Sequence, residues 1–253
     1  MGQSSGKQQQ VTVTKEPEHN FDVNCLTLYE CPFPKIRIGN KGDGGYVVAD
    51  HISSTPYDLL LGAGVGPDIS FEIDFCKKFP NVPCVLFDGT VEKLPKGQRK
   101  NKNIQFIKKN IGPQDTNTET NLHSYIDSHN NIFLKMDIEG AEFPWLETLS
   151  SEHMNKFSQI VIEFHGPNTK KHQRIFEMIN KTHFMVHFHA NNNCQYAMLG
   201  QVLVPSVFEC TYVHKKYFHK MPGLNRTPLP TELDYPNVDH KPVLQITYKP
   251  FVF

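Results

Sequence analysis

The sequence lacks any excess of charge of one sign. It has 253 residues, and Lys plus Arg balance Asp plus Glu at 26 each, so the formal net charge is zero. Phosphate binding needs clustered, uncompensated Lys and Arg, so we expect no DNA partner and no broad nucleic-acid footprint. One basic stretch, residues 96–109, keeps RNA open as an alternative partner, although charge runs usually face water.

Long hydrophobic runs and paired cysteines are also missing. No apolar run approaches the roughly 18 residues that span a membrane, and no signal-peptide core begins the chain, so we expect no stable membrane insertion. The cysteines show neither a CxxC pair nor zinc-ligand spacing, which is typical of reduced thiols and favours a cytoplasmic location. They are Cys25, Cys31, Cys76, Cys84, Cys194 and Cys210.

The length suits one α/β domain with modest extensions. Residues 1–18 are polar and predict a flexible tail, since almost nothing apolar would stabilise them. Residues 19–253 predict a single domain with a core over about 36–215 and a Pro-rich C-terminal extension over 219–253. The late β-like run 243–248 predicts a cover strand or a wrapped tail.

Apolar segments with strand and helix patterns alternate along the core, which indicates a parallel sheet with crossover helices. A hairpin with a Gly-rich turn is expected first, at 35–50. Strands are then expected at 57–61, 84–87, 104–108, 132–136, 159–164, 184–189 and 206–212. Helices are expected at 69–78, 122–128, 143–149 and 169–180, with a weak helix or loop over 91–100. The fold class is therefore α/β and Rossmann-like: a seven-stranded, mostly parallel sheet with an antiparallel last strand and helices on both faces.

Such a sheet binds its ligand outside the carboxyl ends of its strands. At the end of the first strand, the glycines of Leu61-Gly-Ala-Gly-Val-Gly66 allow a tight turn and a close approach of backbone to ligand. The spacing is GxGxG and not the GxGxxG of dinucleotide sites, and alone it fits nicotinamide, flavin or methyl-donor cofactors. The candidate cofactor-binding residues here are Gly62, Ala63, Gly64, Gly66 and Asp68.

Polar residues also follow the second and third strands. Asp88 ends the second strand, where a carboxylate can accept both hydroxyls of a ribose; the alternative is that it caps the next turn. Gly89 follows it, and Asn110 and Ile111 follow the third strand, where they could bracket an adenine.

Three acids, Asp137, Glu139 and Glu142, stand at the mouth of the fourth strand. Desolvated carboxylates repel one another, so sites that tolerate them are usually functional. Asp137 could hold an amino group of the cofactor, ligate a cation or act as a base, whereas Glu142 fits the start of a helix.

Glu163 and His165 end the fifth strand two residues apart, hence on one side of an extended chain. His189 ends the sixth strand. A single histidine of this kind is more often structural, but their convergence on one sheet edge favours function. We predict Asp137, His165 and His189 as catalytic, and Asp137 and Glu163 as ligands of Mg²⁺ or Mn²⁺ instead of zinc.

The chain resembles the FkbM-type family of class I S-adenosylmethionine-dependent methyltransferases over about residues 36–215. The resemblance is carried by the segments Asp43–Val48, Gly62–Gly66 with Asp68–Glu72, Phe87–Thr90, Lys135–Glu142, Ile162–His165 and Val204–Glu209. The Asp-Ile-Glu-Gly-Ala-Glu stretch is the most specific of these.

The resemblance implies the class I methyltransferase fold, S-adenosyl-L-methionine as donor, and O-methylation of a hydroxyl on a sugar, nucleotide sugar or glycan. Methylation of RNA or protein is an alternative, as are a catalytically inactive cofactor-binding module and a nicotinamide oxidoreductase. The extension after Tyr217 departs from the family core, so the acceptor is not carried over.

Overall fold

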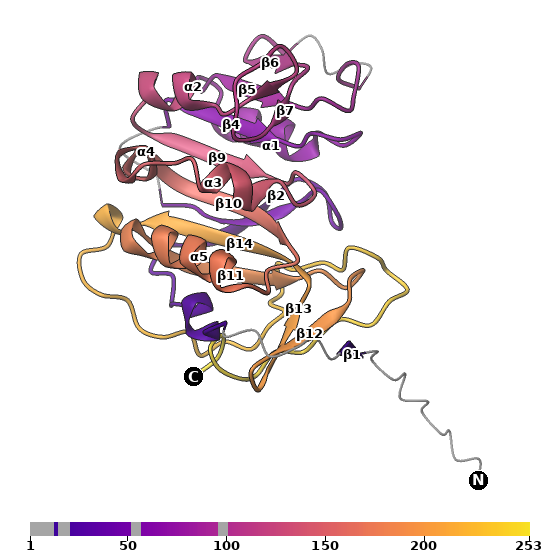
Figure 1. Cartoon of the computed structure of the whole chain (residues 1–253), viewed down its shortest axis with the longest axis vertical. Coiled ribbons are helices and arrows are strands. Elements are labelled where there is room, and N and C mark those ends of the chain that lie inside the picture. Colours follow the sequence, from indigo (N-terminus) through magenta and orange to yellow (C-terminus); the bar gives the residue numbers. More distant parts are fainter. Residues whose placement is uncertain (1–12, 15–20, 52–56, 96–100) are drawn as a thin grey trace.

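The core of the protein is an open seven-stranded sheet with the order β11-β14-β10-β9-β4-β5-β6 (Figure 1). The computed structural model describes residues 13–14, 21–51, 57–95 and 101–253. Only the two pairs that involve β14 are antiparallel among the neighbours in this sheet, so the predicted fold class is confirmed. The strands are β4 (Leu59–Ala63), β5 (Cys84–Phe87), β6 (Ile104–Ile107), β9 (Ile132–Met136), β10 (Phe157–His165), β11 (His183–Ala190) and β14 (Val207–His214).

The strand order reverses between β4 and β9. From β4 the chain builds outward through β5 and β6, then returns to add β9 and β10 on the other side of β4. Such a reversal is the place where open α/β sheets bind ligands, because the loops that leave the two central strands diverge there. The candidate site is therefore expected above the ends of β4 and β9.

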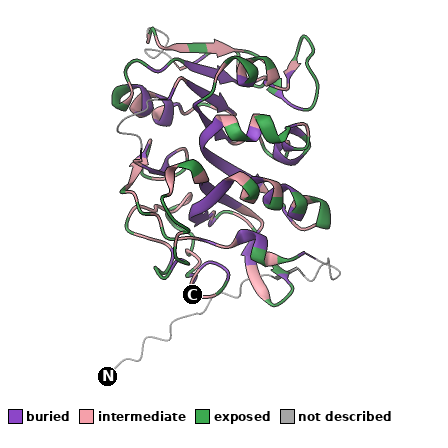
Figure 2. Ribbon diagram, turned by 90° about the vertical axis from the view of Figure 1, so that its left-hand side faces the viewer, coloured by how far each residue is buried: buried purple, intermediate pink, exposed green. Residues whose placement is uncertain are grey.

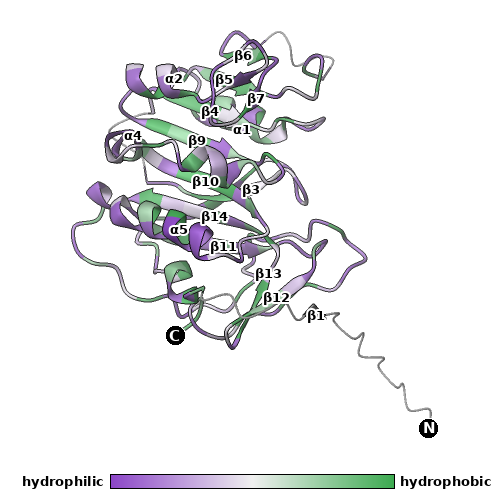
Figure 3. Cartoon of the chain, viewed as in Figure 1, coloured by the Kyte–Doolittle hydropathy of each residue, from purple (hydrophilic) through white to green (hydrophobic). Residues whose placement is uncertain are grey.

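Both faces of the sheet are covered, which explains why its strands are almost continuously apolar. Alternate residues of β4 face the two sides of the sheet: Leu59 and Leu61 belong to the hydrophobic core on one face, and Leu60 belongs to the core on the other face. Figure 2 shows the buried strands between the two layers, and Figure 3 shows their hydrophobic character. The first layer holds α2 (His123–Ser128), α3 (Glu142–Leu146), α4 (Ser151–Lys156) and α5 (Lys170–Thr182); the second holds α1 (Ser70–Lys78) and the hairpin β2 (Lys35–Ile38)–β3 (Tyr46–Ala49).

Several boundaries differ from the prediction. The strand predicted at 57–61 is β4, which starts later and continues through Gly62 and Ala63, since both residues still pair with β9. The helix predicted at 143–149 is α3, which ends earlier, at Leu146. The helix α4 that follows was not predicted; Ser150 caps it by accepting a hydrogen bond from the N–H of His153 at 3.1 Å. Residues 91–95 form no helix, and 96–100 lie outside the described residues.

Short elements were missed by the sequence pattern. They are the pairs β7 (Asn110–Ile111)–β8 (Glu119–Thr120) and β12 (Tyr196–Leu199)–β13 (Val202–Pro205), and the 3₁₀ helices η1 (Val23–Leu26) and η2 (Lys215–Tyr217). Elements of two to four residues are too short to set up a hydrophobic period.

The C-terminal extension wraps the β11 end of the molecule. Its β-like run 243–248 makes a single bridge, Leu229 with Ile246, so it is a wrapped tail and not a strand. Ile246 and Phe251 are fully buried. At the other terminus, β1 (Val13–Thr14) pairs with β12, and the flexibility predicted for residues 1–18 stays a prediction. No described helix has the length and apolar character needed to cross a membrane.

Candidate functional site

The Gly-rich turn lies directly against the end of β9. Gly64 has φ +75°, and a Cβ there would overlap the carbonyl oxygen of Asp137. The N–H of Asp137 donates to the carbonyl of Ala63 at 2.9 Å, and Lys135 Nζ donates to the carbonyl of Gly64 at 2.8 Å. Only glycine lets the two strand ends approach so closely while the chain turns.

Asp88 holds this turn in place from the end of β5. Its Oδ2 accepts hydrogen bonds from the N–H groups of Val65 (3.0 Å) and Gly66 (2.9 Å), and its Oδ1 accepts from the N–H and the hydroxyl of Thr90. Partial burial opposes ionisation, but these hydrogen bonds outweigh it and hold the pKa of Asp88 below its usual value. Asp88 therefore caps the next turn, the alternative raised from the sequence, and also faces the ligand space described next.

Two adjoining pockets of about 340 and 290 Å³ open above the ends of β4, β5 and β9. Both are lined by Gly64, Asp88 and Asp137. Gly62 and Ala63 lie beneath them within β4 and line neither. The other predicted cofactor residues divide between the pockets: Gly89, Asn110 and Ile111 line the first, and Gly66 and Asp68 line the second.

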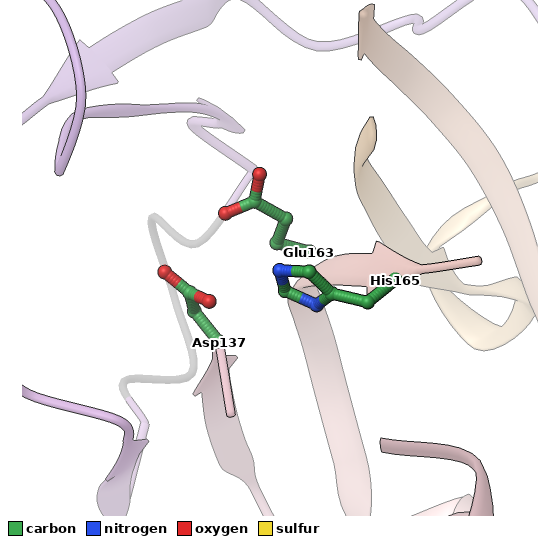
Figure 4. Close-up of side chains that lie close together, drawn as sticks. All are labelled: Asp137, Glu163 and His165. Carbon is green, nitrogen blue, oxygen red and sulfur yellow. The ribbon is translucent and has the colours of Figure 1, made fainter. Parts of the chain in front are cut away.

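At the edge of these pockets the structure brings together Asp137, Glu163 and His165 (Figure 4). One potential ligand atom from each residue lies within 4.8 Å of the others. Asp137 Oδ2 accepts a hydrogen bond from the hydroxyl of Tyr46 at 3.3 Å, and Glu163 Oε1 accepts one from Asn191 Nδ2 at 2.8 Å. In the described part of the chain, Asp137 Oδ1 is buried without a hydrogen-bond partner. Neutral donors thus hold one oxygen of each carboxyl group in place.

The electrostatics follow from this crowding. Burial, then the charges of Asp137 and Glu209, raise the pKa of Glu163 to about 9. Burial would lower the pKa of His165, but the hydrogen bond and charge of Glu142 outweigh it and raise that pKa to about 9. At neutral pH both groups therefore carry a proton, and His165 does not act as a general base there.

His165 is oriented by a carboxylate behind it. Its Nδ1 lies 3.0 Å from Glu142 Oε1, which also accepts from the N–H groups of Ile138 and Gly140. Glu142 is fully buried, and the opposite ring nitrogen, Nε2, lies 3.4 Å from the exposed Glu139. A histidine held by a carboxylate at one nitrogen presents the other for binding, the usual arrangement behind a metal ligand.

His189 is on the same sheet edge, as predicted, but its side chain is engaged elsewhere. Its Nδ1 lies 3.2 Å from Asp234 Oδ1 and its Nε2 lies 3.2 Å from Asn237 Oδ1, both in the C-terminal extension. His187 Nε2 also contacts Asp234 Oδ1, at 2.8 Å. The structure thus places His189 in the anchor of the extension, and its predicted catalytic role gains no support.

This anchor predicts a pH-dependent stability. The carboxylates of Glu209 and Asp234 outweigh burial and raise the pKa of His189 to about 9, whereas His187 and His189 outweigh burial and hold the pKa of Asp234 below its usual value. The pair therefore stabilises the fold fully between the unfolded-state pKa values of about 3.9 and 6.5, and the histidine's share is lost as the pH rises through about 9.

Asp234→Asn should lower the free energy of unfolding by about 3 kcal/mol at pH 6, because a buried charge loses its partner. The loss should shrink above pH 9. Urea unfolding at both pH values measures it, with the exposed Asp239→Asn in the same extension as control. An equal loss of unfolding free energy at both pH values would mean that side-chain packing, and not the ion pair, stabilises the docking of the extension.

Sequence reasoning missed Tyr46 and Asn191, which hold the two carboxylates. Tyr46 belongs to the Asp43-Gly-Gly-Tyr motif, which carried the family resemblance without an assigned role. It comes from the hairpin that precedes the first core strand, so strand-end logic could not place it. Asn191 follows β11 directly, and its position at a strand end was the available signal.

The fold is of the Rossmann-like α/β class, with the candidate site at the carboxyl ends of its central strands. Residues 83–197 match the family model described as "Methyltransferase FkbM domain". The match confirms the predicted resemblance and supports the assignment of the chain to the FkbM-type methyltransferase family and to methyltransferase activity. It covers Asp88, Asp137, Glu163 and His165.

The other comparisons add little. A similar solved structure is the precorrin-6y C5,15-methyltransferase of Geobacter metallireducens GS-15, with 12% identity and a TM-score of 0.32, over 62% of this chain and 80% of that chain. No curated protein matched the sequence.

Proposed function

We propose that the protein transfers a methyl group from S-adenosylmethionine to a hydroxyl of a sugar, nucleotide sugar or glycan. The observation that carries the proposal is the position of Asp137. It lines both pockets above the Gly-rich turn and also belongs to the cluster with Glu163 and His165. One residue therefore lies between the space for the donor and the groups that would activate an acceptor.

The residues present fit the donor. The first pocket combines Asp88 and Asn110, suited to ribose and base, with the apolar Phe87 and Ile138. The second offers Lys135 for a carboxylate and Asp68 for an ammonium group. A Cβ at Gly66 would meet no atom within 4 Å, so the backbone there is open to a ligand. When bound, the donor would supply an activated methyl group on a positively charged sulfur.

A sugar hydroxyl is a poor nucleophile and must lose its proton as it attacks. His165 is protonated at neutral pH because of Glu142, so it orients and compensates charge instead of accepting this proton. Asp137 is the remaining candidate at the pocket edge, with Tyr46 on one oxygen and no partner on the other among the described residues. We therefore assign proton removal to Asp137, alone or with a cation.

A divalent cation is the form of assistance that the cluster suits best. Asp137 and Glu163 would be its oxygen ligands, and His165 Nε2 would be a third once the cation displaces its proton, with Glu142 holding the opposite nitrogen. A bound cation would oppose the burial and the neighbouring acidic charges that raise the pKa of Glu163, and would lower the pKa of the acceptor hydroxyl. Carboxylates with one imidazole favour Mn²⁺ or Mg²⁺.

Removal of the cation should therefore stop turnover. After treatment with a chelator and desalting, methyl transfer should fall by about 10²-fold or more, and Mn²⁺ or Mg²⁺ should restore it. Glu163→Gln should weaken Mn²⁺ binding in a titration, whereas the exposed Glu152→Gln should not. Full activity after chelation would show that no cation takes part, and Asp137 would then be the sole proton acceptor.

Methylation of RNA or protein remains the alternative activity, and a module that binds the donor without turnover is the alternative class. We also infer a cytoplasmic location, which the six free thiols support. Screening labelled donor against nucleotide sugars, glycans, RNA and protein separates these possibilities.

A further inference from the structure

The ring of Tyr46 is held from two sides at the wall of the second pocket. Tyr46 begins β3 and is 2% exposed. The ring of Phe71 meets it edge to face at 5.6 Å between centroids, and Lys135 Nζ lies 5.3 Å from its centroid. Aromatic and cation contacts of this kind fix a ring in one orientation. Its hydroxyl therefore has a defined direction, toward Asp137.

The structure assigns Tyr46 as the positioning residue of Asp137: its hydroxyl donates to Oδ2 at 3.3 Å and fixes the plane of the carboxylate. With Oδ2 held, Oδ1 is the oxygen that has no hydrogen-bond partner among the described residues.

The hairpin that carries Tyr46 is itself held rigidly. Arg37 donates to the carbonyl oxygens of Asn40 (2.6 Å) and Gly42 (2.5 Å) within the turn, and to that of Leu233 (3.2 Å) in the C-terminal extension. One guanidinium thus fixes the turn and ties it to the extension. The extension, which departs from the family core, supports Tyr46 and through it Asp137.

This inference deepens the proposed function, since it assigns an upstream residue to the same reacting centre. Tyr46→Phe removes one oxygen and keeps the ring contacts with Phe71 and Lys135. We expect kcat to fall by roughly 10–100-fold, as for other groups that orient a reacting side chain. The dissociation constant for S-adenosylmethionine, measured by calorimetry, should change by less than about threefold, because shape and charge in the donor pockets are unchanged.

Tyr57→Phe is the matched control. Tyr57 is also buried in the second layer, its hydroxyl accepts from Gln159 Nε2 at 2.7 Å, and it lines neither of the two pockets. It should lower the melting temperature about as much as Tyr46→Phe while leaving kcat unchanged. Equal kcat in both variants, or a loss in Tyr46→Phe that only follows its melting temperature, would overturn the assignment.

Crystal structures of the two variants provide a readout that does not depend on turnover. The Asp137 carboxylate should rotate in Tyr46→Phe and keep its orientation in Tyr57→Phe. If the wild-type protein methylates no hydroxyl, the proposed function fails, but the carboxylate orientation still decides the role of Tyr46. An unrotated carboxylate in Tyr46→Phe refutes the positioning role even if the protein is an active methyltransferase.

Discussion

Gly66→Asn should weaken binding of S-adenosylmethionine by about a hundredfold or more while the protein stays folded. Gly66 has φ +56°, a conformation that asparagine tolerates better than other side chains. A Cβ there meets nothing within 4 Å and the residue lines the second pocket, so a side chain would occupy ligand space without disturbing the fold. Gly64 is unsuitable for this test, because any Cβ would collide with the Asp137 carbonyl.

Gly200→Asn is the control for the backbone cost. Gly200 has φ +64°, also has open space at its Cβ, and lies in the exposed turn between β12 and β13. The melting temperatures of the two variants should lie within a few degrees of each other. In calorimetric titrations with S-adenosylmethionine, only Gly66→Asn should lose the heat of binding. Unchanged donor affinity in folded Gly66→Asn would show that the donor does not bind over this turn.

Asp137→Asn should reduce kcat by roughly a thousandfold, since it removes the group that receives the acceptor proton and keeps its shape. The amide can still accept from the hydroxyl of Tyr46, so the local structure should hold. Donor affinity should fall much less than kcat, because Asp88, Gly66 and Lys135 remain to bind the donor.

The control for Asp137→Asn is Asp127→Asn. Asp127 is an exposed acid near His153 that lines neither pocket, and its replacement should change kcat less than about twofold. Kinetics with saturating acceptor and calorimetry with the donor separate the two effects. If Asp137→Asn turned over normally, the reacting centre would have to lie elsewhere on the sheet edge.

Much of this site could be predicted because the carboxyl ends of the parallel strands lie on the same edge of the sheet. Buried runs such as Cys84–Phe87 and Ile132–Met136 identify the central strands, and parallel strands end on one edge. The positions of Asp88, Asp137, Glu163 and His165 at that edge were predicted in this way. Their proximity follows from topology and needs no knowledge of side-chain contacts.

The rest depended on contacts between distant segments. His189 lies at the predicted sheet edge, but Asp234 and Asn237 of the extension contact its two ring nitrogens. These contacts could not be predicted, because the Pro-rich extension has no hydrophobic period that indicates its path. Tyr46 is 91 residues before Asp137 in the sequence and belongs to the hairpin, not to the seven-stranded sheet. Only the packing of the hairpin on the sheet brings them together.

The pKa values also required the folded structure. From the sequence, His165 has an ordinary histidine pKa near 6.5. The buried Glu142, fixed by two backbone N–H groups, raises that pKa to about 9 and removes His165 as a general base at neutral pH.

The most direct test of the account is transfer of a labelled methyl group from S-adenosylmethionine to a panel of nucleotide sugars, glycans, RNA and protein, with Asp137→Asn in parallel. We expect label in a carbohydrate acceptor, as a methyl ether that resists alkali and is absent from the Asp137→Asn reaction. Label in RNA or protein, or equal label with Asp137→Asn, would contradict it.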